Sequence, residues 1–239
     1  MLCVGVCMCM RRSALFVGVS LAGFILSSNL VRADGPWNAF YVGAHAGYAW
    51  GSADVTDTTG GVAPGPFSYS PKGAFGGGTA GLNWRLQGIL LGVEGDLGYM
   101  DLSGSGTAPS STPPNHQDLT LNGGLYAVGA GRVGYAFGQT LIYGKGGFAY
   151  FDGTAAQTTT KPGYLTSPTS SAFTGWAYGG GVEHFVWRNL SVKVEYLHFD
   201  FGSRVGSQIS ITDPPIGFKY DNKADVTADS VKLGFAYHY

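Results

Sequence analysis

The chain has 239 residues, of which 12% are charged, 14% are aromatic and 40 are glycine. Such a high glycine content is typical of low-complexity disordered chains, but the aromatic content argues against disorder. After residue 33 no apolar run approaches the roughly 18 to 20 residues that a membrane-spanning helix needs. An apolar, aromatic and glycine-rich chain without such helices favours a membrane β-barrel.

The N-terminal segment 1–33 is typical of a secretory signal peptide. Arg11 and Arg12 precede an apolar stretch at 14–26, and small residues lead up to Ala33. The apolar stretch is too short for a membrane anchor helix. We therefore predict export by the Sec route and cleavage after Ala33.

The mature domain is predicted to be a single unit at 34–239. Cys3, Cys7 and Cys9 all precede it, so it contains no disulfide, thiolate site or cysteine-bound metal, and a lipoprotein is excluded. Met10 is a second candidate start, because the residues after it form a conventional signal peptide by themselves. The mature domain keeps 11 Lys and Arg against 15 acids. Its net charge of about −4 and its scattered basic residues give no indication of nucleic-acid binding.

Eight segments of the mature domain alternate apolar with polar or small residues. Strands of a membrane barrel show this alternation between lipid and lumen over about 10 residues each. The predicted strands are 40–51, 74–85, 89–100, 119–137, 140–151, 174–185, 190–201 and 230–239. In the third strand Glu94 and Asp96 share the inward face, and in the fourth we place Leu121 outside and Asn122 inside.

The connections between these strands are alternately long and short. The short ones are 86–88, 138–139 and 186–189, and the long ones are 52–73, 101–118, 152–173 and 202–229. Bacterial barrels have short periplasmic turns and longer external loops. The predicted fold is therefore an all-β, eight-stranded antiparallel up-and-down transmembrane barrel with four long external loops. A soluble eight-stranded barrel would have apolar residues inside and charged residues outside. Here the charged residues share one face of the strands, and the apolar face has almost none, which favours a membrane barrel.

The charged residues of the predicted strands, apart from Asp200, fall on the inward register. They are Arg85, Glu94, Asp96, Arg132, Lys145, Glu183, Lys193, Glu195 and Lys232. Eight strands enclose a space that side chains roughly fill, and buried charges must pair. We predict an ion-pair network that plugs the lumen. A narrow pore lined by the same residues is the alternative, because inward glycines such as Gly47 and Gly81 leave room for water.

Aromatic residues lie near the strand ends, as in the girdles of membrane proteins. The predicted girdle near the loops contains Tyr48, Trp50, Tyr99, Tyr150 and Trp176, and the one near the turns contains Trp84, Tyr135, Phe137 and Trp187. Tyr239 ends the last strand on the same side as the second girdle. These two girdles support a lipid-facing outer surface.

Five segments spread over 34–239 resemble the small porin-family, OmpA-like outer-membrane β-barrel proteins of Gram-negative bacteria. They are Trp37-Asn38-Ala39-Phe40-Tyr41-Val42-Gly43, Tyr143-Gly144-Lys145-Gly146-Gly147, the run from Gly175-Trp176 to Val182-Glu183, Lys193-Val194-Glu195-Tyr196 and Phe235-Ala236-Tyr237-His238-Tyr239. The resemblance implies that Phe235, Tyr237 and Tyr239 form the signal read by the barrel-assembly machinery. OmpA-like proteins carry a peptidoglycan-binding domain after the barrel, and we expect none here because the chain stops at its last strand.

Catalysis, metal binding and cofactor binding have little support in the sequence. His198 and Asp200 share a face near a strand end, but no serine lies beside them in the strand. Neither His116 nor His184 has metal-ligand spacing, and we expect no metal and no cofactor. Some relatives bind haem, for which His116 would be the loop candidate. Its possible partners are Tyr69, Tyr164 and Tyr220, but no spacing supports any of them.

The predicted function is to contribute to envelope integrity and surface interaction in the outer membrane. The alternatives are a small porin-like channel for ions or small solutes, and a surface adhesin or ligand receptor of the haem-binding type. The expected partners are outer-membrane lipid, lipopolysaccharide and the barrel-assembly machinery, without nucleic acid. An external ligand is not identified by the sequence.

Overall fold

The computed structural model describes eight stretches of the chain. They are 37, 39–57, 67–109, 116–159, 164–166, 169–170, 172–210 and 219–239, all within the unit Arg32–Tyr239. The predicted signal peptide and its cleavage site lie outside them. None of the residues in these stretches forms a helix that is long and apolar enough to cross a membrane.

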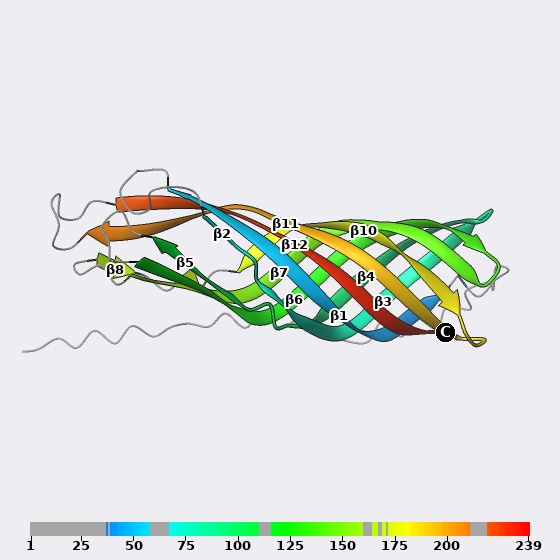
Figure 1. Cartoon of the computed structure of the whole chain (residues 1–239). Helices are drawn as coiled ribbons and strands as arrows, with labels where there is room; N and C mark the ends of the chain where they lie inside the picture. The colour runs from blue at the N-terminus through cyan, green and yellow to red at the C-terminus, as the bar shows by residue number, and fades with distance from the viewer. Residues whose placement is uncertain are drawn as a thin grey trace, which may run out of the picture. The chain divides into compact units, whose positions relative to one another are not determined.

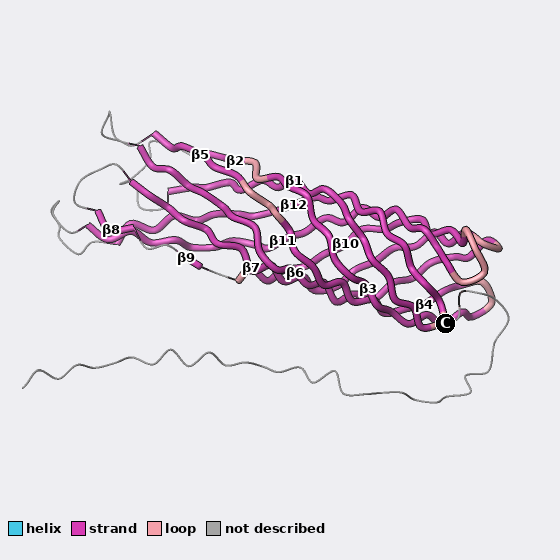
Figure 2. The backbone as a smooth tube through the Cα atoms, turned by 90° about the horizontal axis from the view of Figure 1, so that it is seen from below, coloured by secondary structure: helices cyan, strands magenta, loops and turns pink. Residues whose placement is uncertain are grey.

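Eight long strands form a closed antiparallel barrel, which confirms the predicted fold class. They are β1 (Phe40–Asp57), β3 (Lys72–Leu86), β4 (Ile89–Met100), β6 (His116–Phe137), β7 (Thr140–Thr159), β10 (Phe173–Phe185), β11 (Leu190–Ser210) and β12 (Lys219–His238). Each strand pairs with the next long strand, and β12 closes the barrel on β1. The strands wind obliquely around the barrel (Figure 1), and the short turns lie at the end that carries the C-terminus (Figure 2).

The two-residue turn between β3 and β4 shows why the chain reverses so tightly. Gln87 and Gly88 both have positive φ, 49° and 93°. Two consecutive positive φ values give the hairpin turn whose twist matches that of the flanking strands, and glycine adopts this conformation without strain. We call this end of the barrel the turn side and the opposite end the loop side.

Along the strands, apolar side chains face outward and charged side chains face inward. Leu97 and Phe148 are each 65% exposed, whereas Glu94 and Asp96 are at most 4% exposed. Side chains of successive residues in a strand point to opposite faces, so this pattern produces an apolar outer wall around a charged interior.

The predicted face of Leu121 and Asn122 is wrong. Leu121 is 5% exposed and packs inside the barrel, while Asn122 is exposed. The ladder between β6 and β7 changes register between Asn122 and Leu125. An irregularity of this kind inserts an extra residue in one strand and exchanges the two faces beyond it. Leu121 lies beyond the irregularity and therefore faces inward, whereas Leu125 lies before it and faces outward as predicted.

Several strands continue past their predicted ends on the loop side. β1 extends to Asp57 and β6 has 22 residues, although about 9 to 11 suffice to span a membrane. Four short strands add to these extensions: β2 (Phe67–Tyr69) on β1, β5 (Gly104–Pro109) on β6, β8 (Tyr164–Thr166) on β11 and β9 (Thr169–Ser170) on β7.

The barrel interior has an apolar cluster at each end. The turn-side cluster contains Trp37, Leu90, Ala136, Leu141, Tyr143 and Phe185. The loop-side cluster includes Phe75, Met100, Phe151, Phe173 and Phe199, with smaller residues between them. The inward charged residues lie between the two clusters along their strands.

The expected room above the inward glycines Gly47 and Gly81 is filled by aromatic rings. A Cβ atom on Gly81 would collide with the phenol ring of Tyr41, and one on Gly47 would lie 2.5 Å from Cζ of Phe75. Such distances are far below van der Waals contact, so glycine is needed there for close approach. The ring of a neighbouring strand therefore occupies the space that the sequence suggested for water.

Candidate functional site

Glu94 of β4 lies at the centre of the interior network. Its Oε1 is 2.7 Å from Nζ of Lys145, and its Oε2 is 2.8 Å from Nζ of Lys193. The Tyr41 hydroxyl donates a hydrogen bond of 2.6 Å to Oε2, and Nη1 of Arg132 lies 3.3 Å away. These side chains come from five different strands, so one carboxylate connects most of the barrel wall.

Asp96 and Glu195 join the network from opposite sides by sharing two lysines. Nζ of Lys145 is 2.6 Å from Asp96 and 3.3 Å from Glu195. Nζ of Lys232 is 2.9 Å from Asp96 and 2.6 Å from Glu195. All of these side chains are at most 3% exposed, and charges removed from water need such pairing.

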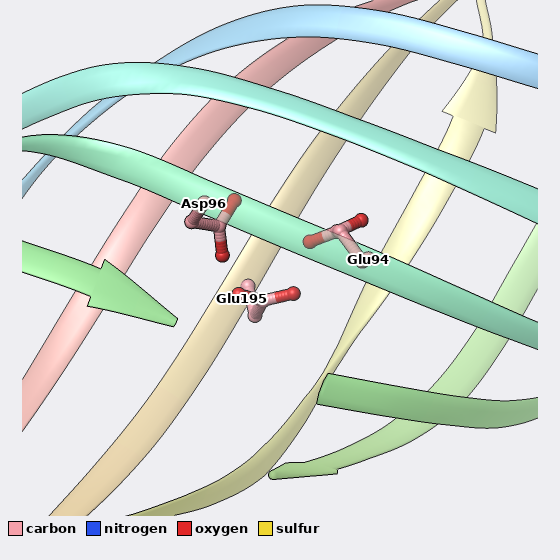
Figure 3. A group of neighbouring side chains, drawn as sticks. All are labelled: Glu94, Asp96 and Glu195. Carbon is pink, nitrogen blue, oxygen red and sulfur yellow. The ribbon is translucent and has the colours of Figure 1, made fainter. Parts of the chain in front are cut away.

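Figure 3 shows the carboxylates of Glu94, Asp96 and Glu195, which converge on one region of the lumen. One oxygen of each lies within 4.8 Å of the other two, a spacing that could suit a metal ion. The ammonium groups of Lys145 and Lys232 already share these oxygens. The three carboxylates are therefore neutralised by lysine side chains, and their arrangement fits an ammonium group better than a divalent metal ion.

Arg132 of β6 connects the centre of the network to its turn-side end. Its Nη1 lies 3.0 Å from Glu183, and its Nε donates to Oδ1 of Asn83 at 2.9 Å. Its guanidinium carbon lies 4.6 Å from the ring centre of Tyr41 and 5.2 Å from that of Tyr143. Stacking on aromatic rings stabilises a desolvated guanidinium, so these tyrosines hold the arginine in place.

Glu183, Ser191 and His238 form the turn-side end of the network. Ser191 Oγ donates to Glu183 Oε1 at 2.6 Å, and Nε2 of His238 lies 3.1 Å from the same oxygen and 3.0 Å from Ser191 Oγ. A serine–histidine–acid catalytic relay needs the acid on Nδ1 and the serine on Nε2. Here both partners meet Nε2, so the group connects β10, β11 and β12 and does not form that relay.

The structure brings together eight of the nine charged residues that the sequence placed in the lumen. Four are cations and four are anions, so their formal charges cancel. Arg85 does not join them: it is half-exposed near the end of β3, and it takes part in no ion pair that the described residues show. It lies two residues beyond Asn83 toward the turn, where water reaches the barrel end.

The predicted lumen network consists of charged residues only and leaves out its uncharged partners. Besides Tyr41, Tyr143 and Asn83, these include His45, whose Nε2 is hydrogen-bonded to the Tyr126 hydroxyl. All of them share the inward register with the charges, as the alternation of the sequence indicates, but alternation does not show which charged group each of them contacts.

On the outer surface, His198 pairs with a different acid from the one that the sequence suggested. Its Nδ1 is 2.7 Å from Asp229 of β12, and Tyr196 donates to the same oxygen at 2.6 Å. Asp200 instead accepts a hydrogen bond from the backbone N–H of Gly202 at 2.9 Å. His198 and Asp229 are directly opposite in the ladder, which brings them closer than two residues on one strand face.

Beyond the membrane-spanning part, Ser203 donates a hydrogen bond to the carboxylate of Asp225. This bond lowers the pKa of Asp225 below its usual range. Among the haem candidates, Tyr69 is half-buried against the loop-side cluster. The side chains of His116, Tyr164 and Tyr220 lie outside those that the structure describes.

The residues predicted for the girdles and for the assembly signal all face outward. The girdle residues Tyr48, Trp50, Trp84, Tyr99, Tyr135, Phe137, Tyr150, Trp176 and Trp187 are between 41% and 76% exposed. Phe235, Tyr237 and Tyr239 follow the same face of β12 and its end, at 51%, 47% and 72%. Their roles in lipid contact and assembly stay predictions.

An apolar outer wall around a filled, charged lumen defines a membrane β-barrel protein. Residues 19–239 match the outer membrane protein beta-barrel domain, and the chain belongs to this family. The resemblance given by the sequence is thereby confirmed, and the protein is an outer-membrane protein.

Two relatives support the same assignment. The chain is 31% identical over 176 residues to the 22 kDa outer membrane protein of Rhizobium leguminosarum bv. viciae, covering 73% of this chain and 69% of that protein. It is 30% identical over 178 residues to the 31 kDa outer-membrane immunogenic protein of Brucella melitensis biotype 1, covering 70% and 72%. The outer membrane protease OmpT from Escherichia coli has a TM-score of 0.50 with 10% identity, covering 87% of this chain and 99% of that one, which shows similarity of fold alone.

Proposed function

We propose that the protein is a non-conducting outer-membrane barrel that contributes to envelope integrity and presents a surface outside the cell. The observation that carries this proposal is the ion pair between Glu94 of β4 and Lys193 of β11. Three strands separate β4 from β11 on either side of the barrel, so the pair bridges opposite walls. A lumen bridged in this way has no room for a wide aqueous path.

The apolar clusters at both ends support a closed lumen. A conducting path needs water to reach the charged groups, but the turn-side cluster and the loop-side cluster cover the network from both directions. Apolar constrictions exclude water and ions. The porin-like channel is therefore the weaker alternative.

A role in surface interaction is supported by the loop-side extension of the strands. With the turns in the periplasm, this extension lies outside the cell, where an outer-membrane protein meets host or environment. The relative from Brucella melitensis is named as an immunogenic protein, which agrees with surface exposure of such barrels. An adhesin or ligand receptor is the second candidate, and its ligand would bind this extension or the loops.

The remaining parts of the proposal concern maturation and chemistry. Sec export, cleavage after Ala33 and recognition of the C-terminal strand by the barrel-assembly machinery deliver the barrel to the membrane. There it contacts lipid and lipopolysaccharide. We assign it no enzymatic activity, because the buried Ser191, His238 and Glu183 group has the wrong geometry for a relay.

Single-channel recording of the refolded mature chain in a planar bilayer tests the closed lumen. We expect no discrete openings from wild-type protein that migrates as a folded barrel on an unheated denaturing gel. Recordings of Glu94→Gln and Lys145→Met show whether the network lines a path. Wild-type openings whose size or ion preference changes in these variants would overturn the proposal and establish a pore.

A further inference from the structure

A small pocket lies on the turn side, where the turn between β10 and β11 meets the end of β12. It has a volume of about 280 Å³ and is lined by Trp187, Arg188, Asn189, Leu190 and Tyr237. This volume is close to the lower limit of about 300 Å³ for small-molecule sites. The pocket is separate from the lumen network.

The backbone holds this pocket in a fixed shape. The N–H groups of Val186 and Trp187 donate to the carbonyl oxygen of Leu190 at 3.0 and 3.1 Å. Asn189 Nδ2 donates to the His238 carbonyl at 2.7 Å, and the His238 N–H donates to the Asn189 carbonyl at 2.8 Å. The turn is therefore attached to the last strand, and a ligand would bind without ordering it first.

The side chains of the pocket combine one cation with two aromatic rings. Arg188 is exposed and makes no ion pair that the described part of the chain shows. Trp187 is 76% exposed and Tyr237 is 47% exposed. Tryptophan and tyrosine prefer the level of lipid headgroups, and a guanidinium binds phosphate through two parallel hydrogen bonds.

We propose that this pocket binds the phosphodiester headgroup of a glycerophospholipid from the periplasm-facing leaflet. Arg188 binds the phosphate, and Trp187 and Tyr237 pack against the glycerol and the first part of an acyl chain. The charge complementarity between the exposed Arg188 and a phosphodiester at the membrane surface selects this occupant. The inference rests on the proposed orientation, with the turns in the periplasm.

Native mass spectrometry of the refolded mature chain in a maltoside detergent tests the site. The probe lipids are palmitoyl-oleoyl-phosphatidylglycerol and dioleoylglycerol, which lacks the phosphate. We expect wild-type protein to retain the phospholipid, and Arg188→Gln to weaken retention by on the order of tenfold. The matched control is Lys72→Gln, which removes an exposed cation opposite Trp50 at the other end of the barrel and should leave retention unchanged.

Equal retention by wild-type protein and Arg188→Gln, or equal retention of the two lipids, would overturn the site. If Arg188→Gln fails to migrate as a folded barrel, Trp187→Ala replaces it, with the same expected loss. The proposed closed lumen is tested by a different measurement. Discrete openings in a planar bilayer would contradict the closed lumen but would leave phospholipid retention unchanged.

Discussion

Glu94 and Lys193 are 99 positions apart in the chain and form an ion pair of 2.8 Å between opposite walls of the barrel. Both side chains are completely shielded from solvent. Removing one partner of such a pair leaves an uncompensated charge, which costs about 3–5 kcal/mol. The barrel is therefore stable only when β4 and β11, which lie far apart in the chain, are assembled so that this pair forms.

Lys193→Met should lower the free energy of unfolding by about 3–5 kcal/mol, because Glu94 loses a cation at a fully buried position. Reversible urea unfolding in lipid vesicles, followed by tryptophan fluorescence, measures the change. The double variant with Glu94→Gln should be less destabilised than the sum of the single variants, since the two groups interact directly. Additive effects would show that the pair is not coupled.

The control for this prediction is Lys223→Met, which removes an exposed ion pair with Asp225 at 3.5 Å. Exposed pairs contribute between about 0 and 1 kcal/mol. The free energy of unfolding should therefore change little in this variant.

Gly81→Ala should destabilise the barrel by about 1–3 kcal/mol, because the added methyl group collides with the Tyr41 ring and displaces a partner of Glu94. The temperature at which the folded band disappears from a denaturing gel reports the effect. Gly129→Ala is the matched control, since no atom lies within 4 Å of a Cβ at that outward position. An equal loss in both variants would show that glycine is needed for backbone reasons.

Trp37→Ala should destabilise the turn-side end of the barrel by about 3–5 kcal/mol. Trp37 is fully buried, lies 4.5 Å from the ring centre of Phe185 and donates from Nε1 to the Gly138 carbonyl at 2.9 Å. Trp37→Phe keeps most of the packing and should lose only about 1 kcal/mol. Urea unfolding compares the two variants, and similar losses would contradict a packing role.

The inward charges could be predicted from the sequence because one rule governs the strands inside a membrane, with apolar residues outside and polar residues inside. Beyond the membrane the outer face meets water and the rule inverts. In β1, Ala53 and Val55 are buried, whereas Asp54 and Thr56 are exposed. The membrane rule therefore predicts too early an end for β1, at residue 51, whereas the strand continues to Asp57.

Other parts of the site depend on the register between paired strands. The alternation in β6 gave no sign of the irregularity that turns Leu121 inward. The position of the Tyr41 ring over Gly81 follows from the register between β1 and β3. Alternation indicates which face a residue occupies, but it does not specify which residue of another strand lies opposite.

The inverted alternation predicts which cysteines a membrane-impermeant maleimide can reach. The predicted mature domain has no native cysteine, so each substitution introduces a single reactive thiol. Asp54→Cys should be labelled on intact cells, because this exposed residue lies on the loop-side extension. Gln139→Cys, in the turn between β6 and β7, should be labelled only after the outer membrane is permeabilised. Leu97→Cys is the control, since a thiol in the lipid-facing wall stays largely unionised and unreactive in both conditions. Labelling of Gln139→Cys on intact cells would show that the turns face outward. It would contradict the orientation on which both the surface role and the phospholipid site depend.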